Sequence, residues 1–246
     1  MLNKRRLNVL QNIPETLSIV VYRGPSALNG APIVAILTGL GRRGSHNTKT
    51  GDMAQLWIMP AEVAPHDAQK TGDDESVCGD CPQRPILGGK CYVRTFQGPR
   101  AAWEKMRDQA PDLARAVEAV KASGRRVRLG AYGDPAALPK SVIHALADAA
   151  VGVTGYTHQW REPRFAYLKG RVMASVESAR DMSVAHAEGW RTFRVLPREQ
   201  VFADLASDEI FCPATSAGLT CKQCRLCDGS KGYLAETRKS IAIVEH

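Results

Sequence analysis

The seven cysteines of this 246-residue chain fall into two groups, and no cysteine lies outside them. The first cysteine group consists of Cys78, Cys81 and Cys91, and the second cysteine group consists of Cys212, Cys221, Cys224 and Cys227. An odd number of cysteines fits a disulfide framework poorly, and buried structural cysteines would be scattered along the chain. Thiolates gathered on short segments are typical of metal binding, so the grouping predicts metal sites.

The second cysteine group follows the pattern C-P-x7-C-x2-C-x2-C within "FCPATSAGLTCKQCRLCDG" (211–229). Close spacing lets one loop bind three corners of a 4Fe-4S cluster, while a more distant cysteine before a proline binds the fourth. Four thiolates in such units can also hold a zinc ion, and the sequence leaves that alternative open. Four thiols predict a closed, fully ligated site without an open position for a substrate.

The first cysteine group, in "CGDCPQRPILGGKCYV" (78–93), supplies only three thiols. A zinc site there would need His66 or a cysteine of the other group as its fourth ligand. A 4Fe-4S cluster could instead use three cysteines and leave one iron open, which could bind a substrate or S-adenosylmethionine. The two groups could also converge on a shared site. The pattern predicts a metal here without deciding among these three arrangements.

Polar and aromatic residues end several strand-like runs later in the chain, where functional groups of parallel α/β folds gather. We expect catalytic roles for Asp134, His158 and Glu177, and cofactor binding by Tyr132, Tyr156 and Trp160. In an extended strand, Tyr156, His158 and Trp160 would share one face and could stack a base or an adenine ring. The competing interpretations are structural: Asp134 would cap a helix that begins at Pro135, and the aromatic residues would form a buried sheet face.

The elements that must position these residues change character along the chain. Residues 1–60 contain three runs rich in β-branched or aromatic residues, at 17–22, 32–40 and 53–60, which predict a small, mainly antiparallel β-region. Residues 98–109 and 112–123 have helical periodicity, and Gly124 is a natural cap for the second helix.

Short apolar runs then alternate with helical segments, and they lie at 126–134, 152–160, 171–178, 191–197 and 240–246. This alternation is typical of βα units in a parallel sheet. We therefore predict an α/β fold, with a β-rich N-terminal region (1–60) followed by a partial (β/α) barrel with two cysteine clusters (61–246), integrated into one domain.

The net charge of +8 and the pI near 9.2 favour a polyanionic partner such as a nucleotide or nucleic acid, although dispersed basic residues also suit a solvated surface. No apolar run is long enough to span a membrane, and the N-terminus lacks the apolar core of a signal peptide. We expect no membrane partner and a cytoplasmic location, where thiols stay reduced.

Several motifs follow one another along the chain: "NTKTGDM" (47–53), "CGDCP…CYV" (78–93), "LGAYGDP" (129–135), "GYTHQW" (155–160), "MASVES" (173–178) and the terminal cysteine-rich segment. Together they resemble a family of uncharacterised proteins of tailed bacteriophages and prophages. The resemblance covers residues from about 30 to the end and implies the host cytoplasm as the location. A looser resemblance is to phage radical SAM-like proteins, in which a segment ending in Cys-Tyr, here Cys91-Tyr92, precedes a βα partial barrel. The cysteine spacing departs from theirs.

Two functional hypotheses follow from these features. The first is an iron–sulfur enzyme, similar to radical SAM proteins, that acts on a nucleotide or nucleic acid and carries one or two 4Fe-4S clusters. The alternative is a non-catalytic, zinc-stabilised protein that binds nucleic acid through its basic surface.

Overall fold

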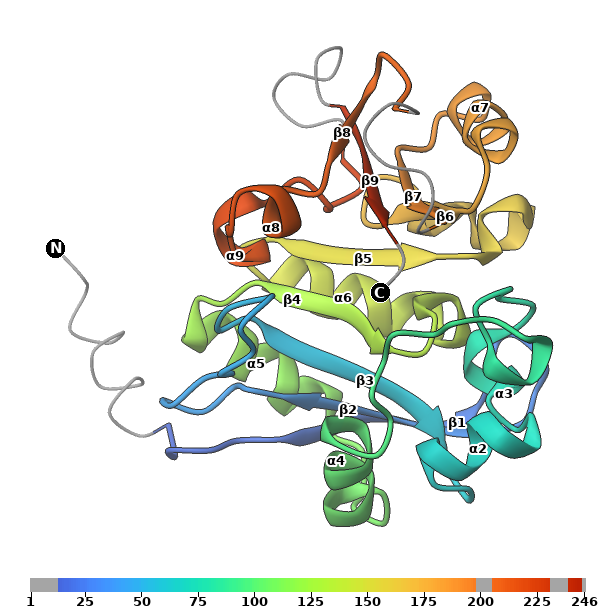
Figure 1. The fold of residues 1–246 in the computed structure, drawn as a ribbon. Coiled ribbons are helices and arrows are strands. Elements are labelled where there is room, and N and C mark those ends of the chain that lie inside the picture. Colours follow the sequence, from blue (N-terminus) through green and yellow to red (C-terminus); the bar gives the residue numbers. More distant parts are fainter. Residues whose placement is uncertain (1–12, 198–204, 231–238, 245–246) are drawn as a thin grey trace, which may run out of the picture.

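Within residues 13–197, 205–230 and 239–244, which the computed structural model describes, nine strands form one sheet (Figure 1). Their order across the sheet is β1 (Ile19–Pro25), β2 (Pro32–Thr38), β3 (Ala54–Pro60), β4 (Val127–Tyr132), β5 (Val153–Thr157), β6 (Met173–Val176), β7 (Thr192–Leu196), β9 (Ser240–Val244) and β8 (Glu209–Phe211). The pairs β1–β2 and β2–β3 are antiparallel, and all pairs from β3–β4 to β8–β9 are parallel. The predicted α/β class with a mostly parallel sheet is confirmed.

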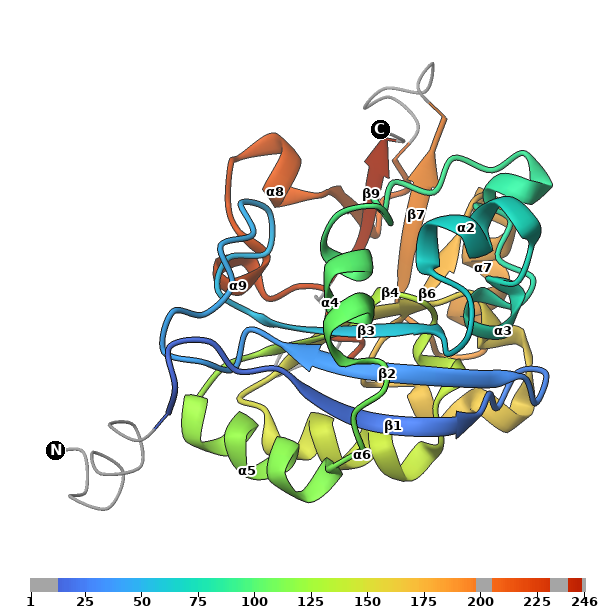
Figure 2. The ribbon, with the colours of Figure 1, turned by 90° about the horizontal axis from the view of Figure 1, so that it is seen from below.

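The helices connect and cover these strands. They are α2 (Pro65–Thr71), α3 (Glu75–Cys78), α4 (Gly98–Met106), α5 (Leu113–Ser123), α6 (Lys140–Ala149), α7 (Ala179–Ala187), α8 (Pro213–Ser216) and α9 (Cys221–Cys224), with 3-10 turns η1 (Pro85–Leu87), η2 (Pro135–Ala137), η3 (Gln159–Arg161) and η4 (Pro163–Leu168). Figure 2 shows α5 and α6 on one side of β1–β3, and α2 and α8 on the other. Because helices cover both sides, β2 has five consecutive buried residues rather than an alternating pattern.

Local sequence explains where α5 begins and ends. The Asp112 carboxylate accepts a hydrogen bond of 2.9 Å from the backbone N–H of Arg115, which satisfies one of the first free donors of the helix. At the other end Gly124 has a φ of 61°, a left-handed conformation that glycine adopts without a steric penalty. Both ends agree with the helix predicted for 112–123.

The sheet changes direction between its two ends. In Figure 2, β7 and β9 run steeply across the direction of β1, β2 and β3. A right-handed strand twist that accumulates over many strands has this effect. The main hydrophobic core lies around β1–β6, and a second, smaller core gathers Met173, Phe193, Cys212, Ile241 and Ile243 beside β7 and β9.

One detail differs from the sequence prediction. The run at 152–160 is a strand only as far as Thr157, because a 3-10 turn begins at Gln159, so the extended stripe predicted through Trp160 is wrong. The three N-terminal strands are antiparallel as predicted, and β3 pairs directly with β4, so one sheet continues across residue 60. In addition, β9 lies between β7 and β8, and the buried guanidinium of Arg194 reaches past it to the Glu209 carboxylate at 2.5 Å.

Candidate functional site

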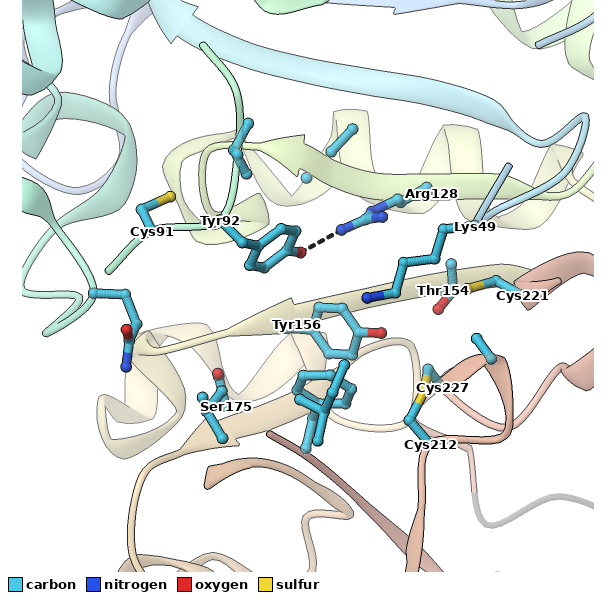
Figure 3. A pocket seen from close by; sticks show the side chains of 18 of the residues that line it. Lys49, Cys91, Tyr92, Arg128, Thr154, Tyr156, Ser175, Cys212, Cys221 and Cys227 are labelled. Carbon is cyan, nitrogen blue, oxygen red and sulfur yellow. Dashed lines mark hydrogen bonds between the residues drawn. The ribbon is translucent and has the colours of Figure 1, made fainter. Parts of the chain in front are cut away.

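All seven cysteines line one cavity, although the two groups are separated by 120 residues of sequence between Cys91 and Cys212. The cavity has a volume of about 170 Å³. That volume corresponds to on the order of ten water molecules, so the cavity is larger than the space of a single ion. Its wall includes inward-facing residues of β4, β5, β6, β7 and β9. Figure 3 shows Cys91 on one side of this space and Cys212, Cys221 and Cys227 on the other.

A buried ion pair holds the segment that carries the first cysteine group. The Arg84 guanidinium binds the Asp74 carboxylate at 2.8 Å, and both side chains are almost fully buried. The same guanidinium donates to the backbone carbonyls of Gly79 and Gly72, at 2.9 and 2.8 Å. Because Cys78 and Cys81 lie between residues held by Arg84, a satisfied polar network fixes the segment that carries these two cysteines.

The second cysteine group is held by segments distant in sequence. The backbone N–H of Cys221 donates to the carbonyl of Lys49 at 2.9 Å, so the loop between β2 and β3 supports α9. Thr220 caps α9 through a capping box with Gln223. The carbonyl of Cys227 accepts a 3.2 Å hydrogen bond from the N–H of Gly155 in β5. The thiols of this group therefore lie against the sheet rather than on a free loop.

Burial raises the pKa of four of these thiols. It raises the pKa of Cys78 well above its ordinary value, and neighbouring Cys81 raises it further. Burial likewise raises the pKa of Cys91, of Cys221 and of Cys227, the last to about 12. Thiols in such surroundings become thiolates when a cation replaces their protons, so metal binding here would release protons.

Within the described ranges, no three His, Cys, Asp or Glu side chains converge on one point that could hold a single metal ion. A cubane cluster does not require such convergence, since each of its thiolates binds a different iron. Thiol donors around a cavity larger than one ion fit that kind of group. His66, the other ligand considered, does not line the cavity; its Nδ1 lies 3.4 Å from the Thr95 hydroxyl.

Two of the predicted catalytic residues meet beside the first cysteine group. The Nε2 atom of His158 lies 2.9 Å from Oε1 of Glu177 and 3.8 Å from the Cys81 sulfur. Burial alone would lower the pKa of His158, but its hydrogen bonds to Cys81 and Glu177 raise it to about 10. The imidazole thus connects a carboxylate to a cavity thiol.

Asp134 has the structural role considered for it, and it also lines the cavity. One carboxylate oxygen accepts from the N–H of Ala136 at 2.9 Å, which caps η2, and the other accepts from the N–H of His158 at 2.8 Å. Burial raises the pKa of Asp134, while these hydrogen bonds act in the opposite direction. Asp134 thereby fixes the backbone of the residue that approaches Cys81.

The three aromatic residues predicted to bind a cofactor are divided by the structure. Tyr132 and Tyr156 line the cavity. The Tyr156 ring packs on Phe193 with 4.1 Å between the ring centroids, and a hydrogen bond links Tyr156 to Cys227. Trp160 lies in the main core with 2% exposure and donates to the Ser175 carbonyl at 3.1 Å, so it packs there instead of lining the cavity. Trp160 does not follow the strand alternation of Tyr156, because β5 ends at Thr157 and a 3-10 turn begins at Gln159.

The cavity wall also includes Lys49, Arg128 and Thr154, for which the sequence predicts no role in the site. Arg128 and Thr154 are register partners on β4 and β5, and the strand period of two could have identified them as neighbours on the inward face. Lys49 reaches the cavity from the loop between β2 and β3, for which no periodic signal exists.

No family model, curated protein or solved structure matches this chain. In the part of the chain that the structure describes, no helix has both the length and the apolar composition that crossing a membrane requires.

Proposed function

We propose that this chain is an iron–sulfur protein whose two cysteine groups each hold a 4Fe-4S cluster on opposite sides of one cavity. We further propose that it is a radical SAM-like enzyme acting on a nucleotide or nucleic acid, with strands β4–β9 arranged as a partial barrel. The resemblance to phage proteins belongs to the same proposal.

The observation that carries this proposal is the convergence of all seven cysteines on a single cavity. Zinc sites that only stabilise a fold are closed and need no shared cavity. The cavity also borders the Asp134–His158 contact and the ring of Tyr156, so groups able to move protons and to stack a ring lie beside the thiols. Parallel α/β sheets commonly carry their functional groups in such a place.

Each part of the chain then has a separate task. Cys78, Cys81 and Cys91 would hold a cluster with one iron open to a ligand, and Cys212, Cys221, Cys224 and Cys227 would hold a closed one. When bound, a reduced cluster with an open iron supplies one electron to S-adenosylmethionine. The paired His158 and Glu177 hold a proton beside Cys81, and the apolar wall with Tyr156 and Phe193 excludes water from the cavity.

The proposal is tested by incubating anaerobically purified protein with a chemical reductant and S-adenosylmethionine and following consumption of the latter by chromatography. We expect consumption by the wild type and none by the triple variant Cys78→Ala/Cys81→Ala/Cys91→Ala. An iron-loaded wild type that leaves S-adenosylmethionine intact would exclude the radical SAM-like activity. A colourless, zinc-containing protein whose affinity for nucleic acid falls steeply with salt would support the non-catalytic alternative.

A further inference from the structure

Polar side chains that are not predicted metal ligands lie in the cavity between the two cysteine groups. Figure 3 shows the side chains of Arg128, Lys49 and Thr154 directed toward one region between Cys91 and the second cysteine group. Arg128 comes from β4, Thr154 from its register partner on β5, and Lys49 from the loop between β2 and β3. Three segments therefore place two cations and a hydroxyl in the same space.

Arg128 has donors that the protein itself does not use. Its terminal nitrogen donates to the Tyr92 hydroxyl at 2.5 Å, while its Nε is buried and has no hydrogen-bond partner. Across the described ranges, Arg128 forms no ion pair with a carboxylate. A guanidinium with a planar fork of donors binds carboxylate or phosphate groups in two-point contacts. In the free protein, the Arg128 guanidinium can therefore still bind a carboxylate or phosphate group.

Two buried hydroxyl groups of the cavity wall also lack partners. Thr154 is 5% exposed and Tyr132 is 2% exposed, and neither side-chain oxygen has a hydrogen-bond partner in the described structure. Buried polar groups are nearly always hydrogen-bonded, and an unpaired one costs folding free energy. An oxygen-rich ligand between them would supply the missing partner for Thr154 in particular, because this residue lies beside Arg128.

The charges of Lys49 and Arg128 agree with an anion in this position, because both side chains line the cavity. Two cations that repel each other in a partly buried site are both stabilised when an anion binds between them. The remaining wall is mainly apolar, with Val93, Tyr156, Phe193, Val195 and Ile243.

We propose that the cavity binds the anionic group, phosphate or carboxylate, of a small organic substrate or cosubstrate between Arg128, Lys49 and Thr154, with the body of the molecule against the apolar wall. This inference rests on the proposed function, since it assigns the ligand class of the same cavity. It differs from a purely electrostatic role, in which the two cations would only offset the charge of thiolates in the second cysteine group.

The test is calorimetric titration of anaerobically purified protein with three probes: AMP, which carries a phosphate, S-adenosylmethionine, which carries a carboxylate, and adenosine, which has neither. We expect AMP or S-adenosylmethionine to bind more tightly than adenosine, and the probe that does so identifies the bound group as phosphate or carboxylate. Arg128→Gln should weaken binding of that probe about 10- to 100-fold, and Thr154→Val about 3- to 10-fold, because charge-assisted hydrogen bonds contribute more than neutral ones.

Arg180→Gln is the matched control, because Arg180 is an exposed arginine of α7 that does not line the cavity. It should leave the affinity unchanged. Equal affinity for all three probes, or an anion affinity that survives Arg128→Gln and Thr154→Val, overturns the inference. Iron content is measured in every sample. If Arg128→Gln loses iron but keeps the preference for the anionic group, Arg128 supports the cluster and the inference is wrong.

A wild type without iron refutes the proposed function. The three probes still test the anion site in that case.

Discussion

At the residue scale, Asp134 shows how one side chain can support both a fold and a site. Its two carboxylate oxygens each accept from a backbone N–H, one in η2 and one at His158. Removing both acceptors leaves two donors unpaired in a buried place, which is the costly case for a hydrogen bond. Burial raises the pKa of Asp134, so keeping its carboxylate ionised in the folded protein costs free energy. At neutral pH this cost offsets part of the stabilisation that the two hydrogen bonds provide.

We therefore expect Asp134→Ala to lower the free energy of unfolding by about 1–2 kcal/mol, measured by urea denaturation. Asp148→Ala is the control, because Asp148 is mostly exposed and pairs with Arg171 on the surface. It should cost about 0–1 kcal/mol, as surface ion pairs do. If the two variants were equally stable, Asp134 would not hold the backbone in the way its hydrogen bonds indicate.

Tyr167 gives a prediction that depends on pH. Its hydroxyl donates to the Leu138 carbonyl at 3.1 Å, and burial, with the charge of Asp134, raises its pKa from 10.0 to about 12. The unfolded chain releases this proton above its ordinary pKa, whereas the folded chain keeps it until about pH 12. The stabilisation is therefore complete below pH 10 and is lost as the pH rises toward 12.

We expect wild type to be more stable than Tyr167→Phe at pH 9, and the difference in free energy of unfolding to shrink between pH 10 and pH 12. Denaturation curves of both proteins across this range provide the measurement. Parallel curves would mean that Tyr167 titrates alike in the folded and unfolded states.

At the element scale, the segment after Cys227 depends on a close backbone approach. A Cβ atom on Gly229 would lie 2.3 Å from the carbonyl oxygen of Val172, beside β6, which is closer than any real contact. Gly218, on the other side of α9, has a φ of 66°, nearly the 69° of Gly229, but a Cβ there would meet no atom within 4 Å. The two glycines share backbone strain and differ in contact.

Gly229→Ala should displace the segment that carries Cys227 and reduce the iron content by roughly half, through loss of the second cluster. Gly218→Ala should retain the iron, since it introduces the same strain of positive φ without a clash. Iron determination per chain compares the two. Equal iron in both variants would show that contact of Gly229 with Val172 does not position the cysteines.

The sequence predicts individual elements better than their assembly. Runs rich in β-branched residues mark most of the strands, and Gly124 marks the end of α5, because these signals are local. The order that inserts β9 between β7 and β8 depends on pairing between distant segments. A strand period continued past Thr157 misplaces Trp160, because a turn begins at Gln159. Lys49 reaches the cavity through a long-range contact with Cys221, which no local pattern predicts.

At the scale of the whole molecule, the twisted sheet brings two distant cysteine segments to one cavity. The first segment is fixed by Arg84 and Asp74, and the second by the loop at Lys49 and the edge of β5 at Gly155. Neither group is supported by its own loop alone. We therefore propose, for the assembled protein, that this fold holds two 4Fe-4S clusters around a shared space.

The measurement that tests this claim most directly is iron and acid-labile sulfide per chain, with the visible spectrum, in anaerobically purified protein. We expect a brown wild type with roughly eight irons, and roughly four in each of two triple variants, Cys78→Ala/Cys81→Ala/Cys91→Ala and Cys221→Ala/Cys224→Ala/Cys227→Ala. A colourless wild type that contains zinc and no iron would contradict it.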